Sequence, residues 1–181
     1  MPMHIQPLPR QPAEPPDGEA DRVVVSQLQH DRGPELYAFA RRLGLSSEAA
    51  EDAVQEALMR LWMAIDAGGP IAKPDSWAFR ALYRVCMDNH RWHRRVARLV
   101  ERLRPATERS VAPTVVDHVT VWDAVDQLPK RQRAAVYLRY RADLPYEEIG
   151  VVLGIQAVSA RSTVSRALDR LGHLLSKEDF R

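Results

Sequence analysis

The chain's 181 residues are 45% hydrophobic and 28% charged, with a formal net charge of +2, and this composition excludes a wholly disordered chain. The sequence carries neither a transmembrane stretch nor a secretory signal, and its single cysteine, Cys86, excludes an intrachain disulfide. We therefore expect a cytoplasmic protein without membrane insertion, and long stretches rich in Ala, Leu, Arg and Glu favour an all-α fold.

The helical patterns fall into two blocks. Residues 1–20 hold six of the thirteen prolines and bury too little apolar surface to offset their ordering entropy, so we predict a disordered tail. Helical patterns occupy 21–104, and a polar, proline-bearing stretch at 105–114 predicts a flexible linker. A second block at 115–176 precedes a short tail at 177–181. The sequence thus predicts two small helical domains joined by a flexible linker.

The first block contains a well-marked central helix. Ser46 or Ser47 can cap it by accepting a hydrogen bond from the first turn. Gly68-Gly69-Pro70 ends it. Apolar residues recur at helical spacing and predict the buried stripe: Ala50, Val54, Ala57, Leu58, Leu61 and Ile65.

The next helix begins near Asp75-Ser76, extends to Leu103, and changes character along its length. Its first half is aromatic and apolar, whereas six arginines and one acid lie between Arg91 and Arg104. Stacking rings and a positive path for phosphates together hold single-stranded DNA. The residues assigned to such a contact are Trp77, Phe79, Arg80, Tyr83, Arg84, Asp88, Arg91, Trp92, Arg94 and Arg95. The alternatives are core packing for the aromatic residues and a solvated face for the arginines.

The second block ends in a pattern typical of a helix-turn-helix. Helices are predicted at 119–128 and 130–141, and then at about 146–153 and 157–175. Gly154 lies at the turn, where a positive φ favours a residue without a Cβ atom. Six apolar residues are spaced to fill the shared core: Ile149, Leu153, Ile155, Ala160, Val164 and Leu168.

Polar residues of this block suit contact with duplex DNA. One face of the last helix carries side chains that reach base edges and phosphates in a major groove: Ser159, Arg161, Ser162, Ser165 and Arg166. Lys130, Arg131 and Arg133 begin an earlier helix and suit phosphate contacts, which position a protein without specifying sequence. The alternative is a plain helical hairpin with a solvated arginine face.

The order of these features resembles the extracytoplasmic-function sigma factors of the sigma-70 family over residues 25–175. SSEAAEDAVQEALMRLW is similar to region 2.2, SWAFRALYRVCMDNHRWHRR to regions 2.3 and 2.4, and VWDAVDQLPKRQRAAVYLRYRADLPYEEIGVVLGI to region 4. The chain departs from the family at Arg84, where asparagine is usual, and at Val158 and Ala160, where Gly and Val are common.

The resemblance implies a set of partners. Core RNA polymerase would be bound through its β′ clamp helices and β flap, and the region 2.2 residues for the clamp helices are Asp52, Gln55, Glu56 and Met59. The aromatic and basic helix would melt and read the promoter −10 element, and the last helix would read the −35 element. The family also implies an anti-sigma partner, and two domains that are spaced by the polymerase and not by each other.

Two other interpretations come from different classes of protein. A stand-alone helix-turn-helix regulator would dimerise on a palindromic site and would not depend on Asp52 or Gln55. A zinc site is conceivable because Cys86, His90 and His93 share one helix face, although no fourth ligand is evident. The sequence contains no phosphate-binding glycine loop, nucleophile elbow or convincing carboxylate pair, so we expect neither enzymatic activity nor a cofactor.

Overall fold

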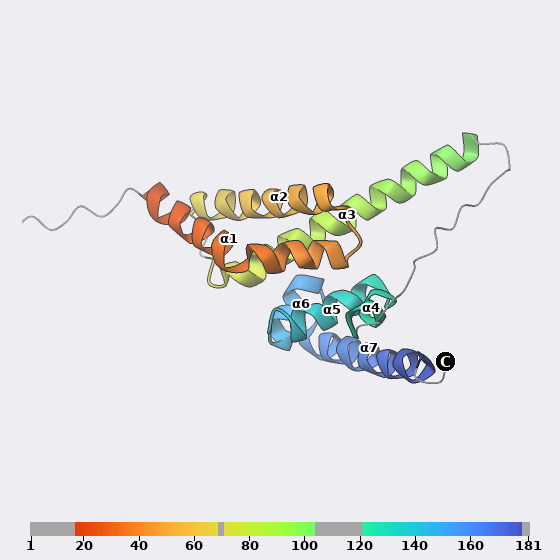
Figure 1. Ribbon diagram of the computed structural model, residues 1–181. Coiled ribbons are helices and arrows are strands. Elements are labelled where there is room, and N and C mark those ends of the chain that lie inside the picture. Colours follow the sequence, from red (N-terminus) through yellow and green to blue (C-terminus); the bar gives the residue numbers. More distant parts are fainter. Residues whose placement is uncertain (1–16, 69–70, 104–120, 179–181) are drawn as a thin grey trace, which may run out of the picture.

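The computed structural model describes residues 17–68, 71–103 and 121–178, and that part of the chain consists of seven helices without a strand (Figure 1). The predicted all-α class is confirmed. The helices are α1 (Asp17–Arg42), α2 (Ser47–Asp66), α3 (Pro74–Leu103), α4 (Val121–Asp126), α5 (Lys130–Tyr140), α6 (Tyr146–Leu153) and α7 (Ala157–Glu178).

The expected boundaries shift at both ends. α1 already begins at Asp17, and α7 continues to Glu178, so parts of both predicted tails are helical. Most of the predicted N-terminal tail and the whole predicted linker at 105–114 lie outside the described residues. None of the described helices is both long and apolar enough to span a bilayer.

The N-terminal unit, which we define as α1–α3, packs around the predicted stripe of α2. Ser46 is the cap, because its side chain accepts a hydrogen bond from the Ala49 amide at 3.2 Å. Most of the stripe is buried, while Val54 and Ile65 are partly buried against the same core. Phe39 of α1 and Phe79 of α3 meet edge to face with ring centroids 5.5 Å apart. Aromatic packing thus joins α3 to α1.

The C-terminal unit, which we define as α4–α7, contains the predicted helix-turn-helix. Gly154 ends α6 in the left-handed conformation, with φ of 67°. Ile149, Ala160 and Val164 are buried as predicted. The prediction for Leu168 is wrong, because its side chain is 42% exposed. The face of α7 continues through Ala167 and Leu171 instead, which pack with residues of α4 and α5 in a second cluster.

The two units contact each other directly. α3 packs against α6, and α1 packs against α5, so one buried cluster includes residues of both units. The C-terminal half of α3 projects past this contact, away from the other helices (Figure 1). The expectation that polymerase sets the spacing of the two domains concerns the polymerase-bound chain and stays a prediction.

Candidate nucleic-acid and polymerase interfaces

The outer face of α2 presents the four residues that the sequence assigns to polymerase. Asp52 and Gln55 are exposed, and Met59 is 56% exposed. Glu56 is half-buried and pairs with Arg60 at 2.5 Å. Met63, which the sequence reasoning missed, is 57% exposed one turn beyond Met59. Two neighbouring exposed methionines form an adaptable apolar surface that suits a protein partner.

The first half of α3 places its aromatic rings mainly in the protein. Phe79 has no exposed surface, and its ring packs edge-on against Phe39. The prediction that Phe79 contacts DNA is therefore corrected, because its ring lies in the core of this structure. Trp77 is half-buried and packs on the same cluster. The alternative of core packing is the one that the structure supports for Phe79.

Arg80 and Tyr83 lie where α3 faces the C-terminal unit. Arg80 lines a shallow hollow together with residues of α6 and the helix-turn-helix turn, including Gly150, Gly154 and Ile155. Its Nε atom is buried and has no hydrogen-bond partner among the described residues. Tyr83 is half-buried, and burial raises the pKa of its hydroxyl although Arg131 and Arg91 act in the opposite direction. Arg80 therefore borders the contact between units, and Tyr83 packs against the buried cluster that both units share.

The second half of α3 leaves its charged residues in solvent. Trp92 is 60% exposed, and the exposed charged side chains around it are Arg84, Asp88, Arg91, Arg94 and Arg95. Arg91 pairs with Asp88 at 3.2 Å, which is an exposed pair of small energetic value. An exposed indole among arginines combines a stacking surface with positive charge, as single-stranded DNA requires.

The side chains considered for zinc lie in surroundings that do not favour metal binding. Burial raises the pKa of the Cys86 thiol to about 12, which disfavours the thiolate that a metal needs. The Nε2 atom of His90 lies 2.7 Å from the Leu43 carbonyl oxygen. Across the described ranges, no three His, Cys, Asp or Glu side chains are grouped to hold a metal ion. The zinc interpretation gains no support.

The exposed face of α7 carries the residues predicted for duplex DNA. Ser159, Arg161, Ser165 and Arg166 are exposed, and Ser162 is half-buried. A surface hollow between this face and the start of α5 is lined by Arg131, Gln132, Ser159, Ser162 and Arg166, among others. The Arg161 guanidinium lies over the Tyr146 ring, 5.0 Å from its centroid. The structure thus brings Arg131 together with the α7 face.

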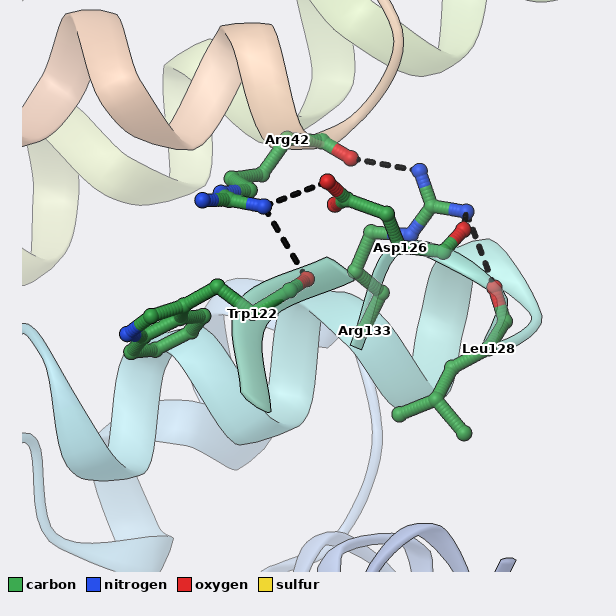
Figure 2. A network of polar contacts seen from close by, with 5 residues as sticks. All are labelled: Arg42, Trp122, Asp126, Leu128 and Arg133. Atoms are coloured by element: carbon green, nitrogen blue, oxygen red, sulfur yellow. Dashed lines mark hydrogen bonds and ion pairs between the residues drawn. The ribbon is translucent and has the colours of Figure 1, made fainter. Parts of the chain in front are cut away.

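Arg133 behaves differently from the other basic residues of α5. Lys130 and Arg131 are exposed, whereas Arg133 is half-buried. Its guanidinium donates hydrogen bonds to three backbone carbonyls: that of Arg42 at 2.7 Å, that of Leu128 at 3.1 Å, and that of Asp126 (Figure 2). The predicted phosphate clamp is therefore split, because backbone carbonyls occupy the Arg133 guanidinium, and one of them, that of Arg42, belongs to the other unit.

The contact between units contains polar groups that the sequence reasoning missed. Figure 2 shows Arg42 of α1 donating to the Trp122 carbonyl, at 3.0 Å, and to the Asp126 carboxylate. Lys73 and Ser76 of the N-terminal unit both donate to the carboxylate of Glu148 on α6. No local pattern marks these pairs, since their members lie more than seventy residues apart in the chain.

Comparison with known families finds two matches in the order in which the helices occur. The family described as "Sigma-70 region 2" matches residues 28–96, and "Sigma-70, region 4" matches residues 118–171. The first match spans most of α1–α3, and the second spans α4, α5, α6 and most of α7. The two matches therefore coincide with the N-terminal and C-terminal units.

Individual proteins show the same similarity over most of their length. An ECF RNA polymerase sigma factor, EcfG of Rhodopseudomonas palustris, is 31% identical, over 81% of this chain and 84% of that protein. SigM of Mycobacterium tuberculosis, another ECF RNA polymerase sigma factor, is 28% identical, over 86% of this chain and 79% of its own length.

Among solved structures, the sigma factor RpoE of Bartonella quintana, in complex with the anti-sigma factor NepR, is similar with a TM-score of 0.62. It is 28% identical, and the match covers 83% of this chain and 96% of that one. CnrH in complex with the cytosolic domain of CnrY has the same fold, with a TM-score of 0.61 at 21% identity, over 89% of this chain and 93% of that one.

Proposed function

This chain belongs to the extracytoplasmic-function sigma factors of the sigma-70 family, and from that premise we propose that it binds core RNA polymerase and directs it to promoter DNA. The observation that carries the proposal is the presence of region 2 and region 4 in one chain, each with an exposed face of suitable chemistry. A stand-alone DNA-binding regulator has no need of region 2. In this role the chain is a non-enzymatic initiation factor that acts in the cytoplasm.

The polymerase contact is assigned to the outer face of α2. Asp52, Gln55 and Met59 are exposed there, and Glu56 lies beside them. Carboxylates repel DNA phosphates, so an acidic face beside two exposed methionines favours a protein over a nucleic acid. The β′ clamp helices are the proposed partner of this face, and the β flap is the proposed partner of region 4.

The promoter contacts are assigned to two separate surfaces. The −10 element would bind along α3, from Trp77 and Arg80 to the exposed arginines around Trp92. The −35 element would bind the exposed face of α7, with Arg161 and Arg166 near base edges and Lys130 and Arg131 on phosphates. Phosphate contacts by arginine and lysine make the affinity strongly dependent on salt.

An anti-sigma protein is the proposed regulatory partner. The support is that the similar sigma factor of Bartonella quintana was solved with an anti-sigma factor bound, at 28% identity to this chain. An exposed basic α3 half and an exposed α7 face are surfaces that such a protein could cover.

The decisive experiment is binding to core RNA polymerase that lacks a sigma subunit. We expect tight binding by the intact chain and weaker binding by an Asp52→Ala, Gln55→Ala double variant. The matched control is Asp31→Ala, Gln29→Ala, which makes the same chemical changes at exposed positions of α1 that are assigned to no partner. Equal binding by the variant and the control would remove the α2 assignment. Absence of binding by every folded form would leave the stand-alone regulator as the better account.

A further inference from the structure

Val158, in the first turn of α7, is the most exposed large apolar side chain among the described residues, at 75%. Single apolar side chains are common on protein surfaces and need no special explanation. Its place in the helix-turn-helix distinguishes Val158 from the others. In this motif the N-terminal residues of the second helix contact base edges in the major groove, and Val158 is the second residue of that helix.

Val158 lies on the side of α7 that faces away from the core. The buried row of this helix consists of Ala160, Val164, Ala167 and Leu171. At about 3.6 residues per turn, Val158 lies roughly half a turn away from the middle of that row. Ser162 and Ser165 follow Val158 at spacings of four and three residues, so the three residues belong to one outward row. The Val158 side chain is therefore near the middle of the face predicted to bind DNA.

The surroundings of Val158 favour a nucleic acid over a protein. Val158 lines the hollow between α7 and the start of α5, together with Arg131, Gln132 and Arg166, and none of the residues that line this hollow is acidic. Arginines at its border suit the phosphates of a bound duplex. Within α7, the neighbours of Val158 on the outward side are serines and arginines. Val158 is therefore not part of a continuous apolar patch on this helix, as a protein partner would favour.

The hydroxyl groups near Val158 are already engaged as donors. The Ser162 hydroxyl donates to the Val158 carbonyl at 3.1 Å, and the Thr163 hydroxyl donates to the Ser159 carbonyl at 2.7 Å. A hydroxyl that gives its single proton to the helix backbone can only accept a hydrogen bond from a base. Val158 adds what these groups do not offer, which is an apolar contact.

The isopropyl group of valine can recognise one feature of a base in the major groove. It neither donates nor accepts a hydrogen bond. Of the four bases, thymine alone presents a methyl group in that groove, and apolar side chains contact this methyl. Cytosine presents an amino donor at the same edge, and a valine packed against it would leave that donor without a partner. An apolar contact from Val158 therefore favours thymine over cytosine.

We propose that Val158 selects a thymine in the −35 element by packing its two γ-methyl groups against the C5 methyl group of that base. This inference rests on the proposed function, and it adds a specificity-determining residue to those assigned to the −35 element. Val158 stands where the family commonly has glycine, which has no side chain to make such a contact. The preference for thymine is therefore a property of this chain, and it is separable from the hydrogen bonds of Arg161 and Arg166.

The first test identifies the base. Core RNA polymerase carrying the full chain selects duplexes from a library of random sequence over the length of a promoter, at fixed ionic strength. We expect the wild type to enrich a T·A pair at one position of the −35 element that Val158→Ser no longer enriches, while the preferences at other positions remain. Val151→Ser is the matched control, because it makes the same change at a valine of α6 that is 50% exposed. It should select the same sequences as the wild type.

The second test isolates the methyl group. Replacing the selected thymine with uracil removes the C5 methyl and leaves each hydrogen-bonding group of the base pair in place. For the wild type we expect about fourfold weaker binding, the effect of withdrawing one methyl group from an apolar contact. Val158→Thr keeps one γ-methyl group and should keep part of this loss, whereas Val158→Ser should bind both duplexes equally. The two variants carry the same hydroxyl and differ by one methyl group, and both should stay folded because Val158 is largely in solvent.

Equal sensitivity of the wild type and Val158→Ser to uracil would overturn the proposal, as would identical selected sequences for the two proteins. A −35 element selected by both would leave the proposed function standing in that case. Identical sequences together with weaker binding of Val158→Ser to core polymerase would assign Val158 to a protein contact instead. A wild-type chain that enriches no sequence at all would sink the proposed function, and this inference with it.

Discussion

Both halves of α3 contain aromatic and basic residues, although in different proportions, and the two halves have opposite surroundings. Near its start, Phe79 is fully buried, Arg80 borders the C-terminal unit, and Tyr83 packs against the shared buried cluster. Beyond His90, Trp92 and the arginines around it are exposed. Aromatic and basic residues therefore pack at one end of the helix and stay free at the other. The role of an aromatic ring in α3 therefore depends on whether other helices pack against it, and not on its residue type.

The largest expected effect is on the free energy of unfolding, and it distinguishes the two halves of α3. Phe79→Ala should lower the free energy of unfolding by about 3–5 kcal/mol, because it leaves a cavity among buried rings. Trp92→Ala should change it by no more than about 0.5 kcal/mol, because the indole is largely in solvent. Chemical denaturation followed by circular dichroism measures both values. Similar losses for the two variants would contradict the division of α3.

The next effect concerns Gly150 of α6, which lies directly against the backbone of the turn that leads into α7. A Cβ atom on Gly150 would lie 2.7 Å from the Ile155 carbonyl oxygen and 3.2 Å from the Ala157 nitrogen, and these backbone atoms cannot move aside cheaply. Gly150→Ala should cost about 1–3 kcal/mol of stability. Gly172→Ala is the control, since nothing lies within 4 Å of its Cβ position and alanine favours a helix. A neutral Gly150→Ala in thermal denaturation would argue against this packing.

Substitutions in the exposed half of α3 should change the affinity for DNA and not the stability of the fold. Trp92→Ala should weaken the binding of the polymerase-bound chain to single-stranded promoter DNA by about 1–3 kcal/mol, the range of one base stacked on a ring. Trp92→Phe is the matched control, because it keeps an aromatic face and should retain most of the affinity. Fluorescence anisotropy measures both. Equal losses in the alanine and phenylalanine variants would exclude stacking.

The smallest effect is a pH dependence of the contact between units. Burial opposes ionisation of Glu148, but hydrogen bonds from Lys73 and Ser76 outweigh it and hold the pKa of its carboxyl below the usual value. A depressed carboxyl pKa stabilises the contact fully above the ordinary carboxyl range. That contribution is lost as the pH falls through the depressed value. The radius of gyration of the wild type, measured by small-angle X-ray scattering, should thus rise in acid more than that of Glu148→Gln, and identical acid responses would count against the contact of Glu148 with Lys73 and Ser76.

Local signals in the sequence predicted the helices and most of their buried faces. Ser46 caps α2 because its side chain reaches an amide three residues on, and Gly154 ends α6 with a positive φ. Both features depend only on neighbours in the chain. Leu168 was misplaced because the buried face of α7 follows Ala160, Val164, Ala167 and Leu171, and this row leaves Leu168 at its edge. The spacing of apolar residues alone cannot decide which of two adjacent residues, such as Ala167 and Leu168, lies on the buried face.

The contact between units could not be predicted in the same way. Arg42 meets Asp126, and Lys73 meets Glu148, across separations of 84 and 75 residues. Nothing in the neighbouring sequence of either partner specifies the other. The exposed faces of α2 and α7 were predicted because amphipathic spacing separates outer from inner residues. Arg80 and Arg133 were assigned to DNA from local patterns, but in this structure their surroundings come from the packing of the two units.

The most direct test of the sigma-factor account is transcription reconstituted from purified parts. Core RNA polymerase lacking sigma would be incubated with this chain and genomic DNA of the source organism, and the 5′ ends of the transcripts mapped. The account predicts start sites that are absent with core polymerase alone and that share two sequence elements at constant spacing. Transcripts identical to those of core polymerase alone, in the presence of a folded chain, would contradict it.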